Sequence, residues 1–176
     1  MMYYPTATHD NWTQGHIDPV WIEDQYHKTF NYVNKPFNDV DTLLGWQNIG
    51  HLYENYTGDI VEWNDLPDCV RQLAGETGLA NMGVSLYKMK PGRIIPEHQD
   101  TYDSYRKVFD ISDEQHIKRY VVFLEDWASG HYLEVAGDAI INWKAGDWVS
   151  WDDDTPHLAA NIGSTDRYTM QITGTF

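Results

Sequence analysis

The chain has 176 residues and a formal net charge of −15, from 27 acidic and 12 basic residues. This excess of negative charge argues against nucleic acid and anionic membranes as partners, because both select proteins with a basic face. Hydrophobic residues make up 41% and aromatic residues 14% of the chain, which is typical of a folded domain.

The cysteine content and the lengths of the apolar runs indicate in which compartment the protein is expected. The one cysteine, Cys69, has no partner for an internal disulfide, which fits a reducing compartment. No apolar run approaches the roughly 18 residues of a membrane span. The first residues, MMYYPTATHDNW, lack the basic and apolar parts of a signal peptide. We therefore expect a soluble, cytoplasmic protein, and the sequence leaves its oligomeric state open.

We expect residues 1–176 to form a single domain whose texture changes near residue 80. Residues 1–80 are predicted to be helical or irregular. The clearest helix is NDLPDCVRQLAGETG, where Asp65 can cap the first turn, Pro67 suits the start, and Gly75 or Gly78 can end it. The apolar face of this helix would be Leu66, Val70 and Leu73.

The second part of the chain, residues 82–176, is predicted to be the β-rich core. The expected strands are 83–89, 117–127, 131–135, 139–143, 147–151 and 167–176. Residues 136–138, AGD, form a short turn, so the strands on either side read as a hairpin. These patterns predict a mainly β protein, a double-stranded β-helix (jelly roll) with N-terminal helices packed on one face.

Two His-x-Asp pairs occur, His98 with Asp100 and His16 with Asp18. Among eight histidines in so acidic a chain, about one such pair is expected by chance, so context must decide between them. Residues two apart on an extended chain point to the same side, and His98 follows a predicted strand and turn. His16 and Asp18 stand before Pro19 in an expected loop. We therefore favour His98 and Asp100 as metal ligands.

A third ligand is predicted at His157, just after the strand DWVSW. Two histidines and one carboxylate on one face make the facial triad that binds non-heme iron(II) and leaves positions open for oxygen chemistry. Ten residues later, Arg167 and Thr169 share one face of the last strand. An arginine inside a barrel needs an anionic partner, and Arg with Thr can hold a carboxylate. A metal-chelating dicarboxylate such as 2-oxoglutarate fits both features.

His98, Asp100, His157, Arg167 and Thr169 agree in order, spacing and expected strand context with a known superfamily. The chain resembles the Fe(II)- and 2-oxoglutarate-dependent dioxygenases over about residues 82–176. The stretch GDWVSWDDDTPHLAANIGSTDRYTMQI looks most like the aspartyl/asparaginyl β-hydroxylase branch and the related free-proline hydroxylases.

This resemblance implies catalytic Fe(II) bound by His98, Asp100 and His157, with 2-oxoglutarate held by Arg167 and Thr169 and O2 as the oxidant. It implies a second contact to the cosubstrate from Arg119, which matches a second arginine often present in this branch. Some members of the branch lack the carboxylate ligand, whereas Asp100 is present here. The activity implied is hydroxylation of an unactivated C–H bond. The substrate would be either a small molecule, a free amino acid, or a peptide, at one of its side chains.

Two other functions stay open at this point. The chain could be a cupin-like metal enzyme that does not use 2-oxoglutarate, or a non-catalytic jelly-roll binding module. Arg167 could pair on the surface with Asp166 or with the run Asp152 to Asp154, and Arg119 could face solvent. That aspartate run could bind a separate metal, although such a run is more often a solvated turn.

Three further patterns surround the expected site. Seven of the 12 basic residues fall within residues 88–119, which predicts either a positive field that attracts 2-oxoglutarate or merely charged strand edges. The polar and aromatic loop 101–116 could be a lid. The tryptophans that could form a substrate wall, or simply core, are Trp21, Trp46 and Trp63.

Overall fold

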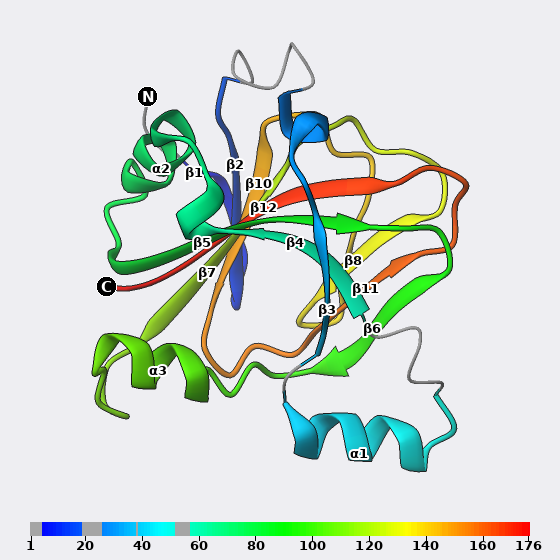
Figure 1. The fold of residues 1–176 in the computed structure, drawn as a ribbon, viewed down its shortest axis with the longest axis horizontal. Coiled ribbons are helices and arrows are strands. Elements are labelled where there is room, and N and C mark those ends of the chain that lie inside the picture. The colour runs from blue at the N-terminus through cyan, green and yellow to red at the C-terminus, as the bar shows by residue number, and fades with distance from the viewer. Residues whose placement is uncertain (1–4, 19–25, 38, 52–56) are drawn as a thin grey trace.

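The strands of the protein form two antiparallel sheets, as a computed structural model of residues 5–18, 26–37, 39–51 and 57–176 shows (Figure 1). The large sheet has eight strands in the order β1-β2-β10-β7-β12-β5-β4-β3, and the small sheet has four in the order β6-β11-β8-β9. This arrangement confirms the prediction of a mainly β jelly roll.

The strands of the large sheet are β1 (Pro5–Thr8), β2 (Trp12–His16), β3 (Val33–Pro36), β4 (Thr57–Glu62), β5 (Ala80–Met89), β7 (Ile117–Phe123), β10 (Asp147–Asp152) and β12 (Arg167–Thr175). Those of the small sheet are β6 (Arg93–His98), β8 (His131–Val135), β9 (Asp138–Ile140) and β11 (His157–Asn161). The helices are α1 (Val40–Asn48), α2 (Asp68–Gly75) and α3 (Asp103–Phe109), with short 3-10 turns η2 (Tyr26–Thr29) and η4 (Trp63–Asp65). No helix among these described residues has the length and apolar character needed to cross a membrane.

The part before residue 80 contributes four strands that the sequence did not predict, so it is not only helical and irregular. β2 pairs with β10, and β4 pairs with β5, so this part extends the large sheet at both edges. Segments such as PTAT and WTQGH are short and polar, and they become strands only because a sheet edge offers backbone partners.

The C-terminal strands agree well with the prediction, with shifted ends. The β8–β9 hairpin is confirmed, with Leu133 opposite Ile140. β9 ends at Ile140 rather than residue 143, because the chain turns there and Asn142 has a φ of 61°. β7 ends at Phe123, four residues before the predicted end at residue 127. β6 and β11 were not predicted as strands, although both carry candidate site residues.

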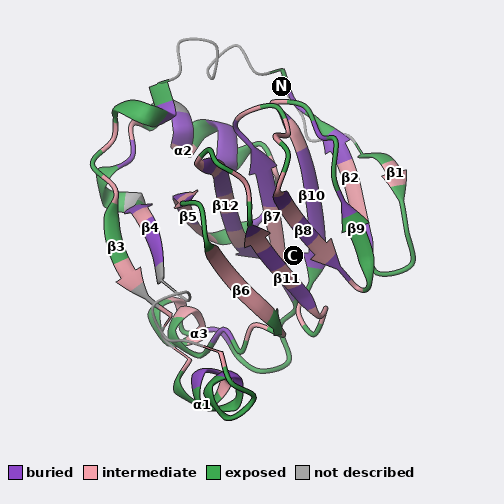
Figure 2. Cartoon of the chain, turned by 90° about the vertical axis from the view of Figure 1, so that its right-hand side faces the viewer, coloured by how far each residue is buried: buried purple, intermediate pink, exposed green. Residues whose placement is uncertain are grey.

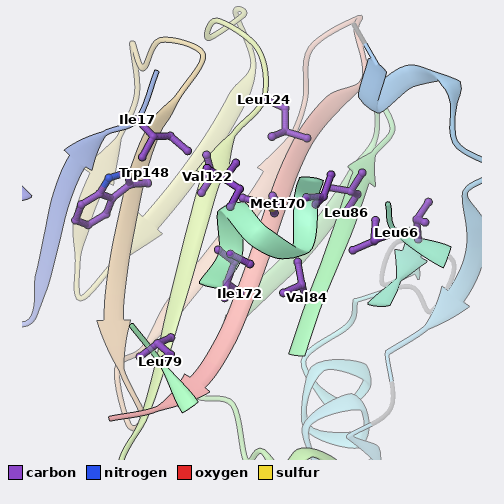
Figure 3. Close-up of a cluster of buried hydrophobic side chains, with 14 residues drawn as sticks. Ile17, Leu66, Leu79, Val84, Leu86, Val122, Leu124, Trp148, Met170 and Ile172 are labelled. Carbon is purple, nitrogen blue, oxygen red and sulfur yellow. The ribbon is translucent and has the colours of Figure 1, made fainter. Parts of the chain in front are cut away.

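Helix α2 covers the outer face of the large sheet (Figure 3). The predicted apolar residues are buried against sheet residues such as Leu86: Val70 and Leu73 lie on the helix, and Leu66 lies just before it. The helix ends at Gly75, as predicted. The expected cap was wrong: the helix begins at Asp68 with Pro67 at the N-cap and no side-chain cap, while Asp65 lies in the preceding turn η4. Pro67 has no side-chain oxygen that could accept from the N–H groups of the first turn, so the helix begins without a side-chain cap.

The space between the two sheets forms a second core and holds the candidate site. Figure 2 shows the small sheet lying across the large one, with buried stretches where they face each other. Because side chains alternate along a strand, Met170 and Ile172 face α2, whereas Arg167 and Thr169 face the small sheet. Helix α1 does not share the face of α2. It packs against β6 through the pair Leu43 and Trp46.

Candidate functional site

His98, Asp100 and His157 meet at one end of the small sheet. His98 is the last residue of β6 and His157 the first of β11, and the two stand directly opposite each other in the strand register. Asp100 follows β6 by two residues. One ligand atom from each lies within 4.8 Å of the others, and no other group of three His, Cys, Asp or Glu residues in the described part of the chain meets this test.

Backbone carbonyls orient both imidazole rings. Nδ1 of His98 lies 2.8 Å from the carbonyl oxygen of Pro96, and Nδ1 of His157 lies 2.9 Å from that of Thr155. A carbonyl only accepts, so Nδ1 carries a proton in each ring, and in the neutral form of the imidazole it is Nε2 that keeps the lone pair. Both Nε2 atoms face Asp100, 3.5 Å from its Oδ1 for His98 and 3.7 Å from its Oδ2 for His157. Two imidazole lone pairs and one carboxylate therefore converge on one point.

The surroundings set the protonation states that a metal requires. Burial lowers the pKa of His157 to about 4, so the ring is neutral at neutral pH. Burial alone would raise the pKa of Asp100, but the positive charge of the nearby Arg119 guanidinium opposes it, and that pKa lies well below its usual range. Metal ligation needs neutral imidazole and ionised carboxylate, and both are present without a metal.

Aromatic rings enclose the two histidines. The rings of Phe37 and Trp46 each meet the His98 ring edge-on, with centroids 5.4 Å away, and Trp151 lies 4.9 Å from His157. Trp46 is buried, and its indole N–H donates to the carbonyl of Glu97 at 3.3 Å. Trp46 therefore supports a candidate ligand. Trp21 and the side chain of Trp63 lie outside the described residues.

A cavity of about 510 Å³ opens beside the three candidate ligands and extends between the sheets to β12. Arg167 and Thr169 line it, so the structure brings together all five positions on which the sequence argument depended. Arg119, on β7, lines it as well.

Arg167 is a buried cation with no ion pair among the described residues. It is 5% exposed, and its one hydrogen bond there runs from Nη1 to the carbonyl oxygen of Tyr132, at 2.6 Å. Its Nε and the hydroxyl of Thr169 are buried without a hydrogen-bond partner in the described part of the structure. Burial lowers the pKa of Arg167 to about 10, since nearby groups compensate its charge so weakly. Surface pairing with Asp166 is not observed.

Arg119 occupies a different environment from Arg167. Its Nη2 lies 2.8 Å from Oδ2 of Asp100, and its Nη1 donates to Oε1 of Gln171 at 3.2 Å. Arg119 does not face solvent: it lies beside a candidate metal ligand. Gln171 was not singled out from the sequence, although its spacing places it on the same face of β12 as Arg167 and Thr169.

The alternative positions for a metal are engaged elsewhere. His16 is exposed, and its Nδ1 lies 2.8 Å from Asp147 on the neighbouring strand. In the aspartate run, Asp152 pairs with Lys118 at 3.1 Å and Asp153 with Arg106 at 3.2 Å. These carboxylates bind basic side chains and connect surface segments.

Tyr87 is a further cavity residue that the sequence did not indicate. Burial raises its pKa to about 12, and it is one of the groups that interact electrostatically with Arg167. Its position opposite Thr169 in the β5–β12 register brings the ring to the cavity. No sequence signal distinguishes this tyrosine from the other 11.

No protein-family model matches this sequence, and no curated protein matches it. Similar solved structures include a Pseudomonas putida prolyl-4-hydroxylase, with 15% identity over 89% of this chain and 97% of the other and a TM-score of 0.51. Another is SnoK, a non-heme α-ketoglutarate-dependent carbocyclase from nogalamycin biosynthesis, with 12% identity over 86% and 81% of the chains and a TM-score of 0.51. The cupin domain of Schizosaccharomyces pombe Cnp3 is more distant, with 11% identity over 68% and 65% and a TM-score of 0.42. At these identities, the likeness to the prolyl-4-hydroxylase and to SnoK shows a shared fold and nothing further.

Proposed function

We propose that this protein is an Fe(II)- and 2-oxoglutarate-dependent dioxygenase that hydroxylates an unactivated C–H bond of an amino acid or a peptide side chain. We place it nearest to the aspartyl/asparaginyl β-hydroxylase and free-proline hydroxylase branch. The prolyl-4-hydroxylase and carbocyclase of similar fold agree with this class at a general level. The substrate is a small molecule or a peptide, in keeping with the acidic surface.

The observation that carries the proposal is Arg167 in the same cavity as the three candidate ligands. An unpaired guanidinium between two sheets is costly unless an anion joins it. The Thr169 hydroxyl beside it is also without a partner among the described residues, so the pair offers a charge-assisted site for one carboxylate. A dicarboxylate could bind Arg167 and Thr169 through one carboxylate and chelate the metal with its other end, and it would then satisfy both the clamp and the metal site.

The residues present fit Fe(II). The donor set is two imidazole nitrogens and one carboxylate, the combination typical of non-heme iron(II) oxygenases. His98, Asp100 and His157 would hold the ion. When bound, Fe(II) with O2 and 2-oxoglutarate supplies the oxidation of a C–H bond to an alcohol, coupled to the conversion of 2-oxoglutarate to succinate and CO2.

The chain itself supplies binding, orientation and exclusion of water. Arg167 and Thr169 bind the carboxylate far from the metal and so fix the direction of the cosubstrate. Part of the cavity wall between the sheets is apolar, formed by residues that include Ile95, Val121 and Leu133. Such a wall keeps water from the reacting carbon and leaves polar contacts to the few groups that orient the ligand.

One specific feature separates this function from the two alternatives. A cupin-like enzyme without 2-oxoglutarate needs the metal ligands and has no need of a buried carboxylate clamp, and a binding module needs neither. Arg167 and Thr169 therefore favour the oxygenase over a cupin-like enzyme, and the convergent Nε2 atoms favour a metal enzyme over a binding module.

The test is aerobic incubation of the full chain with Fe(II) and 2-oxoglutarate, with and without panels of free amino acids and short peptides. We expect slow succinate formation without substrate and faster formation with the correct panel member. Arg167→Met should lose most succinate formation at sub-saturating 2-oxoglutarate and recover part of it at high concentration. A wild-type protein that binds metal and never binds or consumes 2-oxoglutarate would contradict the proposal and favour the cupin-like alternative.

A further inference from the structure

Asp100 and Arg119 form an ion pair inside the molecule. Nη2 of Arg119 lies 2.8 Å from Oδ2 of Asp100, and both side chains are 18% exposed. Arg119 comes from β7 in the large sheet, whereas Asp100 follows β6 in the small sheet. The pair therefore joins the two sheets at the point where the candidate metal ligands meet.

Arg119 is itself held from two further sides. Its Nη1 donates to Oε1 of Gln171 at 3.2 Å, and the ring of Tyr102 lies 5.4 Å from the guanidinium carbon. Gln171 lies on β12, two residues beyond Thr169. A guanidinium with an ion pair, a side-chain acceptor and an aromatic neighbour has little freedom to turn toward another ligand.

The two arginines of the cavity thus differ in availability. Arg167 has no anionic partner among the described residues, while Arg119 is engaged with Asp100. Nε of Arg119 has no hydrogen-bond partner among the described residues, but a cosubstrate carboxylate bound at Nη2 would have to compete with a buried carboxylate that is already 2.8 Å away. This contrast argues against the role in cosubstrate binding that the family resemblance implies for Arg119.

We propose that Arg119 is a positioning residue for Asp100, and that Gln171 orients Arg119. The ion pair with Arg119 is at Oδ2, so it would fix the carboxylate with Oδ1, which lies 3.5 Å from Nε2 of His98, turned toward the metal. The inference rests on the metal site of the proposed function and does not depend on 2-oxoglutarate. Partners that orient a metal ligand typically contribute about 10- to 100-fold in metal affinity, which sets the size of the expected effect.

The first arm of the test measures metal binding alone. Co(II) is titrated anaerobically into the full chain without 2-oxoglutarate and followed by visible absorption. Arg119→Met should weaken Co(II) binding by about 10- to 100-fold, because it leaves a buried carboxylate oxygen without its partner. Arg119→Lys, which keeps the charge and loses the two-pronged geometry, should recover part of the loss. Gln171→Leu should weaken binding by a smaller factor.

The second arm measures 2-oxoglutarate binding to protein saturated with Co(II). Arg119→Met should keep the wild-type dissociation constant within about threefold, whereas Arg167→Met should raise it by more than about tenfold, in line with the loss of a charge-assisted carboxylate contact. The inference is overturned if Arg119→Met leaves the Co(II) affinity unchanged. If this variant also weakens 2-oxoglutarate binding as much as Arg167→Met does, Arg119 is a cosubstrate-binding residue instead.

Lys118→Met is the matched control, since Lys118 is the neighbouring residue on β7, carries the same charge and pairs on the surface with Asp152. It should leave both dissociation constants unchanged. If Arg119→Met does not fold, as judged by circular dichroism, Arg119→Lys and Gln171→Leu carry the test alone. A wild-type protein that binds Co(II) and not 2-oxoglutarate would contradict the proposed function and leave the first arm intact.

Discussion

At the residue scale, the meaning of His98 and Asp100 depends on residues far along the chain. The sequence predicted the three ligands and the clamp from order and strand context, and the structure brings all five residues to one cavity. The ring orientation was not predictable, because it depends on the carbonyls of Pro96 and Thr155, whose directions follow from backbone geometry. The pairing of Arg119 with Asp100 was not predictable either, because it joins residues of two different sheets, whose relative placement the local sequence does not give.

The buried, neutral His157 should make the metal-free protein lose stability on mild acidification. Its pKa is about 4 in the folded state and about 6.5 unfolded, so the unfolded chain binds the extra proton first as the pH falls. The free energy of unfolding should therefore decline between about pH 6.5 and pH 4, by up to roughly 3 kcal/mol from this group. Urea unfolding in the presence of a chelator measures it.

The control for this profile is His157→Gln, which has no titrating ring and should show a shallower decline over the same window. His131 is also buried, and burial lowers its pKa as well, so part of the decline should persist in the variant. Identical pH profiles for the two proteins would contradict a neutral, buried His157.

Thr169→Val tests the clamp without removing charge. Thr169 is 1% exposed and its hydroxyl lacks a hydrogen-bond partner among the described residues, so loss of the hydroxyl should cost little stability. It should weaken 2-oxoglutarate binding by about three- to tenfold, equivalent to one hydrogen bond of about 1 kcal/mol. Calorimetric titration and a thermal melt measure the two quantities. A lower melting temperature with unchanged binding would assign the hydroxyl a structural role.

At the element scale, strong period-two patterns were predictable and short strands were not. β8 and β12 alternate clearly and appear at their predicted positions. β6 contains Pro96, and β11 (HLAAN) contains alanine and asparagine, which are depleted in strands, so neither carries a pattern that stands out before its partner is known. The strands before residue 80 form through pairing at sheet edges, which the local sequence does not encode. The segment 101–116, expected to be a loop, contains helix α3 (Asp103–Phe109), and its role as a lid stays a prediction.

Gly58 on β4 is required by the close approach of Tyr87. A Cβ at Gly58 would lie 2.0 Å from the Tyr87 ring, which must then move within the cavity wall. Gly58→Ala should destabilise the protein by about 1–3 kcal/mol and weaken 2-oxoglutarate binding, because the Tyr87 ring lies near Arg167. Chemical unfolding and calorimetric titration measure both effects.

A double-mutant cycle with Tyr87→Leu should recover most of the cost of Gly58→Ala, since the clash is removed. Gly45→Ala is the matched control. Gly45 lies inside α1 with no atom within 4 Å of an added Cβ, so this change should stabilise the protein by about 0.5–1 kcal/mol. Additive effects of Gly58→Ala and Tyr87→Leu would show that the two sites are not in contact.

At the scale of the whole molecule, the basic residues of positions 88–119 are largely neutralised. Five of the seven have a carboxylate partner: Lys88, Lys90, Arg106, Lys118 and Arg119. The field that a dianion meets on approach is therefore dominated by the net charge of −15.

The affinity for 2-oxoglutarate should consequently stay within about twofold or strengthen when salt is raised from about 50 to about 500 mM, because salt screens the long-range repulsion and affects the buried Arg167 less. Isothermal titration across a salt series measures this. A severalfold weakening with salt would instead indicate attraction by an exposed basic surface, as the clustering in the sequence allowed.

The central claim is that one cavity binds a metal through His98, Asp100 and His157 and a dicarboxylate through Arg167. Anaerobic addition of Fe(II) and 2-oxoglutarate tests both halves at once, because the chelate gives a weak visible charge-transfer band. We predict a band in the wild type and in Lys118→Met, a weaker band in Arg167→Met at equal ligand concentration, and none in His98→Ala. A folded wild-type protein that gives no band at saturating Fe(II) and 2-oxoglutarate would contradict the account.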